Sequence, residues 1–450
     1  MDRPAADRFG LIALCTLLLV AVVFGGGGSR FGIANLVVQL TAIAVLAIRS
    51  DAGLRFWREA PLSLRGLIVL AMMLPLAQLI PLPSHIWADL PGRDLVARSF
   101  DAARTDGWMT WSVNPLRTAL AMTALVTPLA VLMAGWTMPR QNLVQIGWVV
   151  VATGIVTALM GLVQLNPAGE NVALFGARSP GSFLLGTFAN RNSTALLLGF
   201  CLTLACLLPA PRPHSAVLWM RVAAAALLLV AIVLTKSRTG LALSVIPLGL
   251  AALKGWTWLL EDRSERSAGR RAVNPALIAL GALGLAGVAV GGLVIAAPDR
   301  MNETLERFEA KDDPRRFIWE DVVYAAERYW PVGAGVGNFD EVFQVDESLE
   351  NLTLRTAGRA HNDYLELAIE AGLPGLTLAA LWIALCLGMA WQARRAPMAW
   401  TGWAGGAFLL AIALQSITDY PLRNQAILAA AGFALLLLSR SVIDRERRQS

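Results

Sequence analysis

One histidine stands in a short motif whose residue types suit proton transfer. His361 lies in the run RAHNDYLELAIEAGLPG (359–375), near the end of the longest polar segment of an otherwise apolar chain. Imidazole titrates near neutral pH and often serves as a general base. The same residue also suits the plain role of a polar cap on a helix at an interface. Proton transfer and capping are therefore the two interpretations of His361.

The residues after His361 predict a short helix that holds the imidazole in place. Asn362 and Asp363 can each cap its start, and Gly372 followed by Pro374 is typical of a helix end. On such a helix His361, Leu365 and Ile369 share one face, because they are four residues apart. The motif thus predicts an imidazole anchored at the start of a helix.

Two arginines lie where apolar segments begin. Arg191 falls between two asparagines in GTFANRNSTA (186–195), and Arg238 falls in TKSRTG (235–240). An arginine so close to hydrocarbon is costly unless it meets an anion, a lipid head group or water. Snorkelling of the guanidinium toward the interface is the alternative for each residue. Two guanidiniums at one membrane face suit the forked binding of a diphosphate.

The composition places these motifs in a membrane protein. The chain has 450 residues, of which 56% are hydrophobic and only 16% charged, and its mean hydropathy is +0.57. Charged residues make up about a quarter of ordinary soluble domains. Long apolar runs recur along the chain, so we expect an all-α polytopic membrane protein with about 12 transmembrane helices. The predicted spans are 9–25, 31–48, 65–82, 116–136, 144–165, 193–209, 217–235, 239–257, 275–297, 374–393, 399–418 and 425–439.

The distribution of basic residues orients these spans. The formal net charge is +6, but the basic residues lie between apolar spans, so we expect no nucleic-acid partner. With an even number of spans the arginine clusters share one side, and the positive-inside rule places both termini in the cytoplasm. These clusters are Arg49, Arg55, Arg58 and Arg65; Arg263, Arg266, Arg270 and Arg271; Arg394 and Arg395; and Arg440, Arg445, Arg447 and Arg448. His361, Arg191 and Arg238 then all lie at the outer, periplasmic face.

This topology divides the chain into four regions. Residues 1–165 form N-terminal spans with a periplasmic loop at about 83–115, and residues 166–297 form core spans that carry both arginine motifs. Residues 298–373 form a large periplasmic loop with 17 acidic and 8 basic residues, which is too long for a simple connection. Residues 374–450 form the C-terminal spans and a cytoplasmic tail.

Two stretches of the large loop have clear local patterns. RRFIWEDVVYAAERYW (315–330) has apolar residues at helical spacing. PVGAGVGNF (331–339) contains three glycines, but no strand precedes it and no Lys-Ser/Thr follows it. A turn is therefore favoured over a phosphate-binding loop. We predict that this region is a partly helical periplasmic cap.

Together the three motifs resemble those of a known superfamily, the O-antigen ligases and Wzy-type O-antigen polymerases. These are bacterial inner-membrane glycosyltransferases that use lipid-linked glycans. The family pattern of His-Asn, nine residues, Gly, two residues and Gly is matched by His361, Asn362, Gly372 and Gly375. GTFANRNSTA is similar to the family's Gly-x-Phe-x-Asn segment, and TKSRTGLAL to its Ser-Arg-Gly/Thr segment. The resemblance covers about 160–420 well.

The resemblance implies a reaction and its partners. The donor is expected to be a glycan on undecaprenyl diphosphate, whose diphosphate Arg191 and Arg238 bind while His361 takes the proton of the attacking hydroxyl. One-step displacement inverts the anomeric carbon, and the two arginines neutralise the leaving group, so we expect no metal and no cofactor. Expected partners also include a glycan or lipid A-core acceptor, membrane lipids, and a chain-length regulator or flippase. Further candidates for substrate contact, whose arginines could equally form surface ion pairs, are Arg316, Arg355, Arg359, Asn362, Tyr364 and Asp419.

Three functions remain as hypotheses. The first is polymerisation of lipid-linked oligosaccharide repeat units into exopolysaccharide or O-antigen. The second is a ligase that transfers the finished glycan to lipid A-core, in lipopolysaccharide biosynthesis, or to a protein. The acidic loop suits an anionic lipid A-core poorly, which favours the polymerase. The third is a transporter or lipid-linked glycan flippase, which normally needs charged groups at mid-membrane, and the span centres contain almost none.

Overall fold

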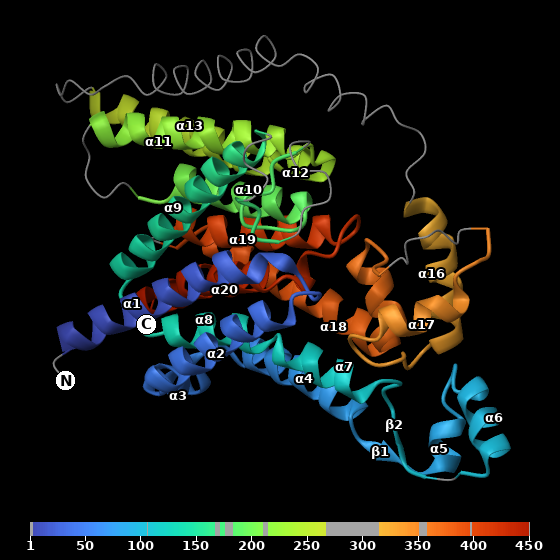
Figure 1. The fold of residues 1–450 in the computed structure, drawn as a ribbon. Helices are drawn as coiled ribbons and strands as arrows, with labels where there is room; N and C mark the ends of the chain where they lie inside the picture. The colour runs from blue at the N-terminus through green and yellow to red at the C-terminus, as the bar shows by residue number, and fades with distance from the viewer. Residues whose placement is uncertain are drawn as a thin grey trace.

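The chain forms a helical bundle with a smaller helical region at one end (Figure 1). A computed structural model describes residues 3–105, 107–166, 172–175, 183–209, 215–266, 315–350, 358–396 and 398–449. One two-stranded antiparallel ribbon, β1 (Pro81–Leu82) with β2 (Met109–Thr110), accompanies the helices. The helices are α1 (Arg3–Phe24), η1 (Gly25–Gly27), α2 (Gly32–Ile48), α3 (Ser50–Glu59), α4 (Leu62–Gln78), α5 (Ser84–Ala88), α6 (Asp94–Ala103), α7 (Pro115–Thr123), α8 (Val126–Gly135), α9 (Arg140–Gln164), α10 (Arg191–Leu207), α11 (Ser215–Leu234), α12 (Arg238–Leu243), α13 (Val245–Arg266), α16 (Arg315–Tyr329), α17 (Phe339–Asp346), α18 (Asp363–Ala393), α19 (Ala399–Gln415), η3 (Pro421–Arg423) and α20 (Gln425–Gln449).

The helices have the length and composition of a multi-pass membrane protein. Among the described residues, seven helices are long and apolar enough to cross a membrane. The pair α2 and α3, bent by 78°, adds an eighth if it is one span, and α4, α10 and α19 are shorter apolar helices. The predicted spans other than 275–297 all fall on these helices, and 275–297 lies outside the described residues. The count of twelve therefore stays a prediction.

Helix α20 lies at the centre of the bundle. It packs against α19, α8, α18 and α1, and 83% of the apolar stretch within residues 425–443 is buried. By contrast only 11% of the apolar stretch of α18 is buried, and its exposed side chains include Leu381, Leu387 and Trp391. Apolar side chains exposed in this way are stable only against lipid. The core is therefore shared between α20 and its neighbours, while α18 lies at the rim.

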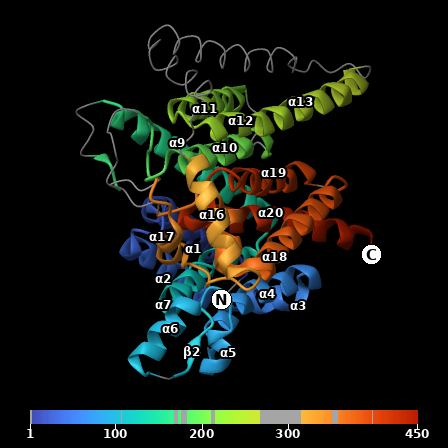
Figure 2. The same cartoon turned by 90° about the vertical axis from the view of Figure 1, so that its right-hand side faces the viewer.

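The two ends of the bundle differ. Both chain termini lie at one end, and α16, α17, α5 and α6 lie at the other (Figure 1). Figure 2 looks onto this second end, where α16 packs against α18. The helix predicted at 315–330 is confirmed as α16. The termini thus share one end of the bundle, and the side of the membrane on which that end lies stays a prediction.

A glycine-rich turn closes the first part of α18. In PVGAGVGNF the N–H groups of Ala334 and Gly335 donate to the carbonyl oxygens of Ile369 and Glu370, both at 2.8 Å. These carbonyls need outside partners because the helix is interrupted at Gly372, which has φ +55° and ψ −144°. A Cβ on Gly372 would lie 2.0 Å from a carbonyl oxygen of the turn. The predicted turn and the predicted helix end are both confirmed, and the chain then resumes as helix to the end of α18.

Candidate active site

His361 lies just outside α18 rather than on it. Asn362 is the N-cap, and its side-chain oxygen accepts the N–H groups of Tyr364 and Leu365 at 3.0 and 3.1 Å. His361 therefore precedes the cap and has φ +52°, in the left-handed region. The prediction that His361 shares a helix face with the apolar residues after it is wrong, because the helix begins only at Asp363. Its imidazole is positioned by a loop instead.

A buried carboxylate orients the imidazole. The Nδ1 atom of His361 lies 3.3 Å from Oδ1 of Asp419, whose side chain has no exposed surface, whereas 36% of the histidine side chain is exposed. The other carboxylate oxygen accepts the side-chain amide of Asn190 at 3.0 Å. A carboxylate can only accept here, so Nδ1 carries a proton, and in the neutral imidazole the lone pair then lies on Nε2. This arrangement suits a general base.

Tyr420 lies beside the imidazole. The two ring centroids are 5.1 Å apart and the rings are tilted by 57°. Burial, together with the neighbouring Asp419 carboxylate, raises the pKa of Tyr420 to about 12. The phenol therefore stays neutral near pH 7, so it can pack against a substrate or donate a hydrogen bond but does not act as a base.

The two arginines are positioned by the same local device. Arg191 is the first residue of α10 after the N-cap Asn190, and Arg238 is the first residue of α12 after the N-cap Ser237. The hydroxyl of Ser237 also donates to the side-chain oxygen of Asn192 at 2.7 Å. Since these bonded residues each adjoin one of the arginines, the two arginine motifs lie side by side. The guanidinium of Arg191 lies over the Phe183 ring, 5.2 Å from its centroid.

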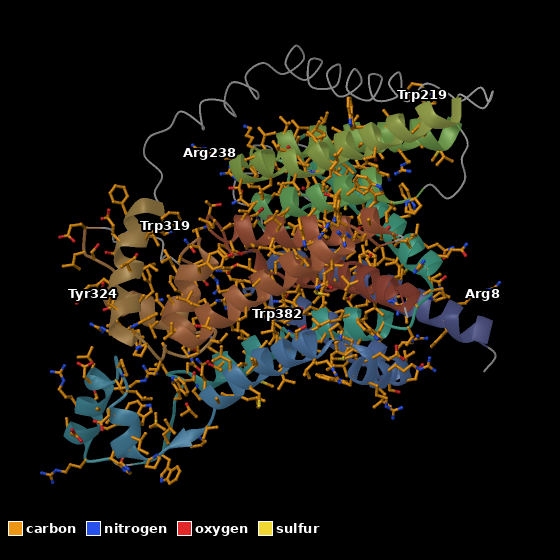
Figure 3. All side chains as sticks on the ribbon, turned by 180° about the vertical axis from the view of Figure 1, so that it is seen from behind. Arg8, Trp219, Arg238, Trp319, Tyr324 and Trp382 are labelled. Atoms are coloured by element: carbon orange, nitrogen blue, oxygen red, sulfur yellow. The ribbon has the colours of Figure 1, made fainter. Side chains whose placement is uncertain are left out.

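Hydrogen bonds join the arginine motifs to the turn that carries Asp419. The side-chain amide of Gln415 donates to the carbonyl oxygen of Asn192 at 3.1 Å, and the hydroxyls of Thr239 and Thr418 are 3.0 Å apart. The N–H of residue 363, directly after the N-cap of α18, is bonded to carbonyl oxygens of the same turn. In Figure 3 Arg238 lies toward the side of the bundle where Trp319 is labelled, and Arg8 lies at the opposite end. The structure thus brings together the three motifs that the sequence singled out.

The other predicted contacts divide into two groups. Arg359 is bonded to the carboxylate of Glu366 at 3.1 Å and to the hydroxyl of Ser29, and the hydroxyl of Tyr364 donates to the carbonyl oxygen of Ala413 at 2.8 Å. These side chains, like that of the N-cap Asn362, therefore have partners within the protein. The second group cannot be placed, because Arg355 and the side chain of Arg316 lie outside the described residues.

Arg423 was not predicted from the sequence and lies next to this site, against the first turns of α18. Its guanidinium is 2.6 Å from Glu370, 3.4 Å from Glu366 and 3.7 Å from Asp363. Burial opposes its charge, but the carboxylates of Glu370, Glu366 and Asp363 raise the pKa of Arg423 above its ordinary value, so it stays charged. The sequence does hold a signal, because acidic residues at i, i+3 and i+7 of an apolar helix require a buried cation.

Comparison with known proteins bears on the family. Residues 223–380 match the family model described as O-antigen ligase. This match supports the resemblance of the chain to the O-antigen ligase and Wzy polymerase superfamily. No curated protein matches the chain. The matched region contains Arg238 and His361, while Arg191 and Asp419 lie outside it and are joined to it by the hydrogen bonds described above.

The family match bears on the chemistry. Proteins of the family are glycosyltransferase-like enzymes, and the family implies lipid-linked glycan substrates in a membrane. The O-antigen ligase match therefore supports a ligase- or polymerase-type function for this multi-pass protein.

Proposed function

We propose that the protein is an inverting glycosyltransferase that polymerises undecaprenyl-diphosphate-linked oligosaccharide repeat units into exopolysaccharide or O-antigen. The observation that carries the proposal is the chain of contacts from His361 to Asp419 and on to Asn190, the residue that precedes Arg191. A polarised imidazole and two arginine motifs are the groups that glycosyl transfer from a diphosphate requires. The family match supports the same reaction type.

His361 is the proposed general base. The attacking hydroxyl of the acceptor loses its proton to Nε2 as its oxygen forms a bond to the anomeric carbon of the donor. Asp419 accepts from Nδ1 and stabilises the imidazolium that results. A base of this kind typically contributes about 10²–10⁴-fold to the rate. Asn190 keeps the carboxylate in place through its second oxygen.

Arg191 and Arg238 are the proposed binding groups for the leaving diphosphate. The bond from the anomeric carbon to the diphosphate breaks as the new bond forms, and its electron pair leaves with undecaprenyl diphosphate. Guanidiniums can bind phosphate oxygens in a forked geometry and offset the charge that develops there. The N-terminus of α10 adds partial positive charge at the same place. These groups replace the metal ion that many glycosyltransferases use, so the proposed reaction needs none.

The proposed site faces the periplasm. The protein is proposed to cross the bacterial inner membrane twelve times, with both termini in the cytoplasm. The shared end of the termini and the arginine clusters support this topology. The cap formed by residues 298–373 is then periplasmic. A reporter that is active only in the periplasm is expected to be active when it is fused within this cap. Activity of a reporter that works only in the cytoplasm, fused at the same place, would contradict the topology.

Polymerisation is proposed over ligation because the 298–373 segment has 17 acidic and 8 basic residues, which disfavours an anionic lipid A-core acceptor. Glycan profiling of a deletion strain tests this choice. Accumulation of single lipid-linked repeat units is expected for a polymerase. Accumulation of long lipid-linked chains that never reach their final acceptor would identify a ligase instead.

A further inference from the structure

Ala360, the residue before His361, is held at both of its backbone polar groups. The N–H of Ala360 donates to Oε1 of Glu366 at 3.0 Å, and its carbonyl oxygen accepts the indole N–H of Trp319 at 2.8 Å. Ala360 itself has no exposed surface. Trp319 belongs to α16 and is labelled in Figure 3 at the same end as Arg238. The backbone that leads into His361 is therefore fixed from two sides.

The conformation of His361 explains why such fixing is needed. A residue with a side chain adopts φ near +52° only when its surroundings impose that conformation. On its C-terminal side the loop is held by the Asn362 cap. On its N-terminal side the contacts of Ala360 are the restraint, and Glu366 supplies one of them from the first turn of α18. Without this restraint the loop can relax to a common φ and carry the imidazole away.

Glu366 also joins the loop of His361 to the turn of Asp419. Its second oxygen lies 3.1 Å from Arg359 and 3.4 Å from Arg423. Arg423 belongs to the segment that begins at Asp419 and enters α20. The fully buried carboxylate of Glu366 thus contacts both Ala360, which precedes His361, and Arg423, which follows Asp419 in the chain.

We propose that Glu366 is a positioning residue, which holds His361 at the distance and angle from Asp419 that proton transfer to Nε2 requires. This inference rests on the proposed function of His361 as the base. Glu366 touches neither the imidazole nor the arginines assigned to the diphosphate. It acts through the backbone of Ala360 and through Arg423.

Glu370 provides a matched control one turn further along α18. It is also fully buried, and it also bonds Arg423, at 2.6 Å. Its other oxygen accepts the N–H of Phe339, in the cap, and not a peptide next to His361. Replacing either carboxylate with Gln removes one buried charge beside Arg423. Only the change at Glu366 disturbs the loop of the base.

The test compares Glu366→Gln with Glu370→Gln in full-length protein reconstituted in proteoliposomes with a lipid-linked oligosaccharide donor. Glu366→Gln is expected to lower kcat at least about tenfold with KM changed less than about threefold, because orientation and not binding is lost. Glu370→Gln is expected to keep kcat within about threefold of wild type. Equal losses of kcat in the two variants, or a wild-type kcat in Glu366→Gln, would overturn the proposal.

A second measurement does not depend on turnover. The chain has three histidines, so a background of His85→Gln and His214→Gln leaves His361 as the only imidazole for ¹⁵N NMR. The unaltered site is expected to show protonation at Nδ1. Glu366→Gln should shift or broaden this signal, whereas Glu370→Gln should leave it unchanged, and an unchanged signal in both variants contradicts the positioning role. The turnover of His361→Ala in proteoliposomes separates the proposed function from the proposed positioning role of Glu366. If His361→Ala is active, the proposed function fails; if it is inactive while Glu366→Gln is fully active, only the positioning role fails.

Discussion

The Nδ1 atom of His361 lies 3.3 Å from Oδ1 of Asp419, a carboxylate that has no exposed surface. The two residues are 58 positions apart, on either side of α18 and α19. A buried carboxylate needs a partner that offsets its loss of water, and here the partners are the imidazole and the amide of Asn190. The pair therefore fixes which nitrogen of the histidine faces outward.

Removing the charge of Asp419 should impair catalysis and not binding. In Asp419→Asn the amide can present its N–H₂ group to Nδ1, which favours the wrong tautomer of His361. We expect kcat to fall by about 10²–10⁴-fold with KM for the donor little changed. Initial rates with a lipid-linked donor measure both parameters. Asp89→Asn, an exposed residue after α5, is the control, and equal rates in the two variants would contradict the role of Asp419.

Activity should depend on the guanidinium groups of Arg191 and Arg238 and not only on their positive charge. Lysine keeps the charge but loses the planar fork that binds two phosphate oxygens. Arg191→Lys and Arg238→Lys are expected to lose about 10–10³-fold in kcat/KM, and the alanine variants to lose more. Arg98→Lys, at an exposed pair with Asp94, is the control. Full activity in both lysine variants would rule out forked binding.

The bundle could be predicted from the sequence to a useful extent. Runs of apolar residues separated by arginine clusters locate the helices, because a helix in lipid must satisfy its own backbone and cover itself with apolar side chains. The breaks were harder to foresee. The segment predicted as one span at 116–136 is divided into α7 and α8. The helix end at Gly372 was predicted, but not its dependence on the turn that begins at Pro331.

The candidate site was only partly predictable. His361, Arg191 and Arg238 stand out because such side chains are costly near hydrocarbon. A cap at Asn362, which the sequence favours, already places His361 before the first turn, so the predicted shared helix face was a wrong interpretation and not a missing signal. The acidic residues of α18 indicate a buried cation, but local pattern could not identify it as Arg423, because α18 and η3 meet only in the fold. Contacts between distant segments decide these features.

The interruption at Gly372 should depend strictly on glycine. In Gly372→Ala the new Cβ meets the carbonyl oxygen of Pro331 in a backbone conformation that a side chain disfavours. We expect a loss of about 1–3 kcal/mol and a lower thermal midpoint in detergent. Gly388→Ala, in the same helix with open space around its Cβ, should be neutral or stabilising. A wild-type midpoint for Gly372→Ala would mean that the break is not rigid.

Tyr420 should influence stability at alkaline pH and not the pH dependence near neutrality. Burial and Asp419 raise the pKa of Tyr420 from 10.0 to about 12, so the fold disfavours the phenolate. Its contribution is fully present below pH 10 and is lost as the pH rises toward 12. Tyr420→Phe is therefore expected to flatten the fall of the thermal midpoint over that interval. An identical fall in both proteins would show that Tyr420 titrates normally.

The most direct test of the account is the turnover of His361→Ala in proteoliposomes supplied with a synthetic undecaprenyl-diphosphate-linked repeat unit. The variant is expected to insert, to retain binding of the donor, and to lose chain extension by about 10²–10⁴-fold, because the acceptor hydroxyl has no base. His85→Ala, at an exposed position on α5, should extend chains normally. Chain extension at the wild-type rate by His361→Ala would contradict the central claim that this imidazole takes the proton.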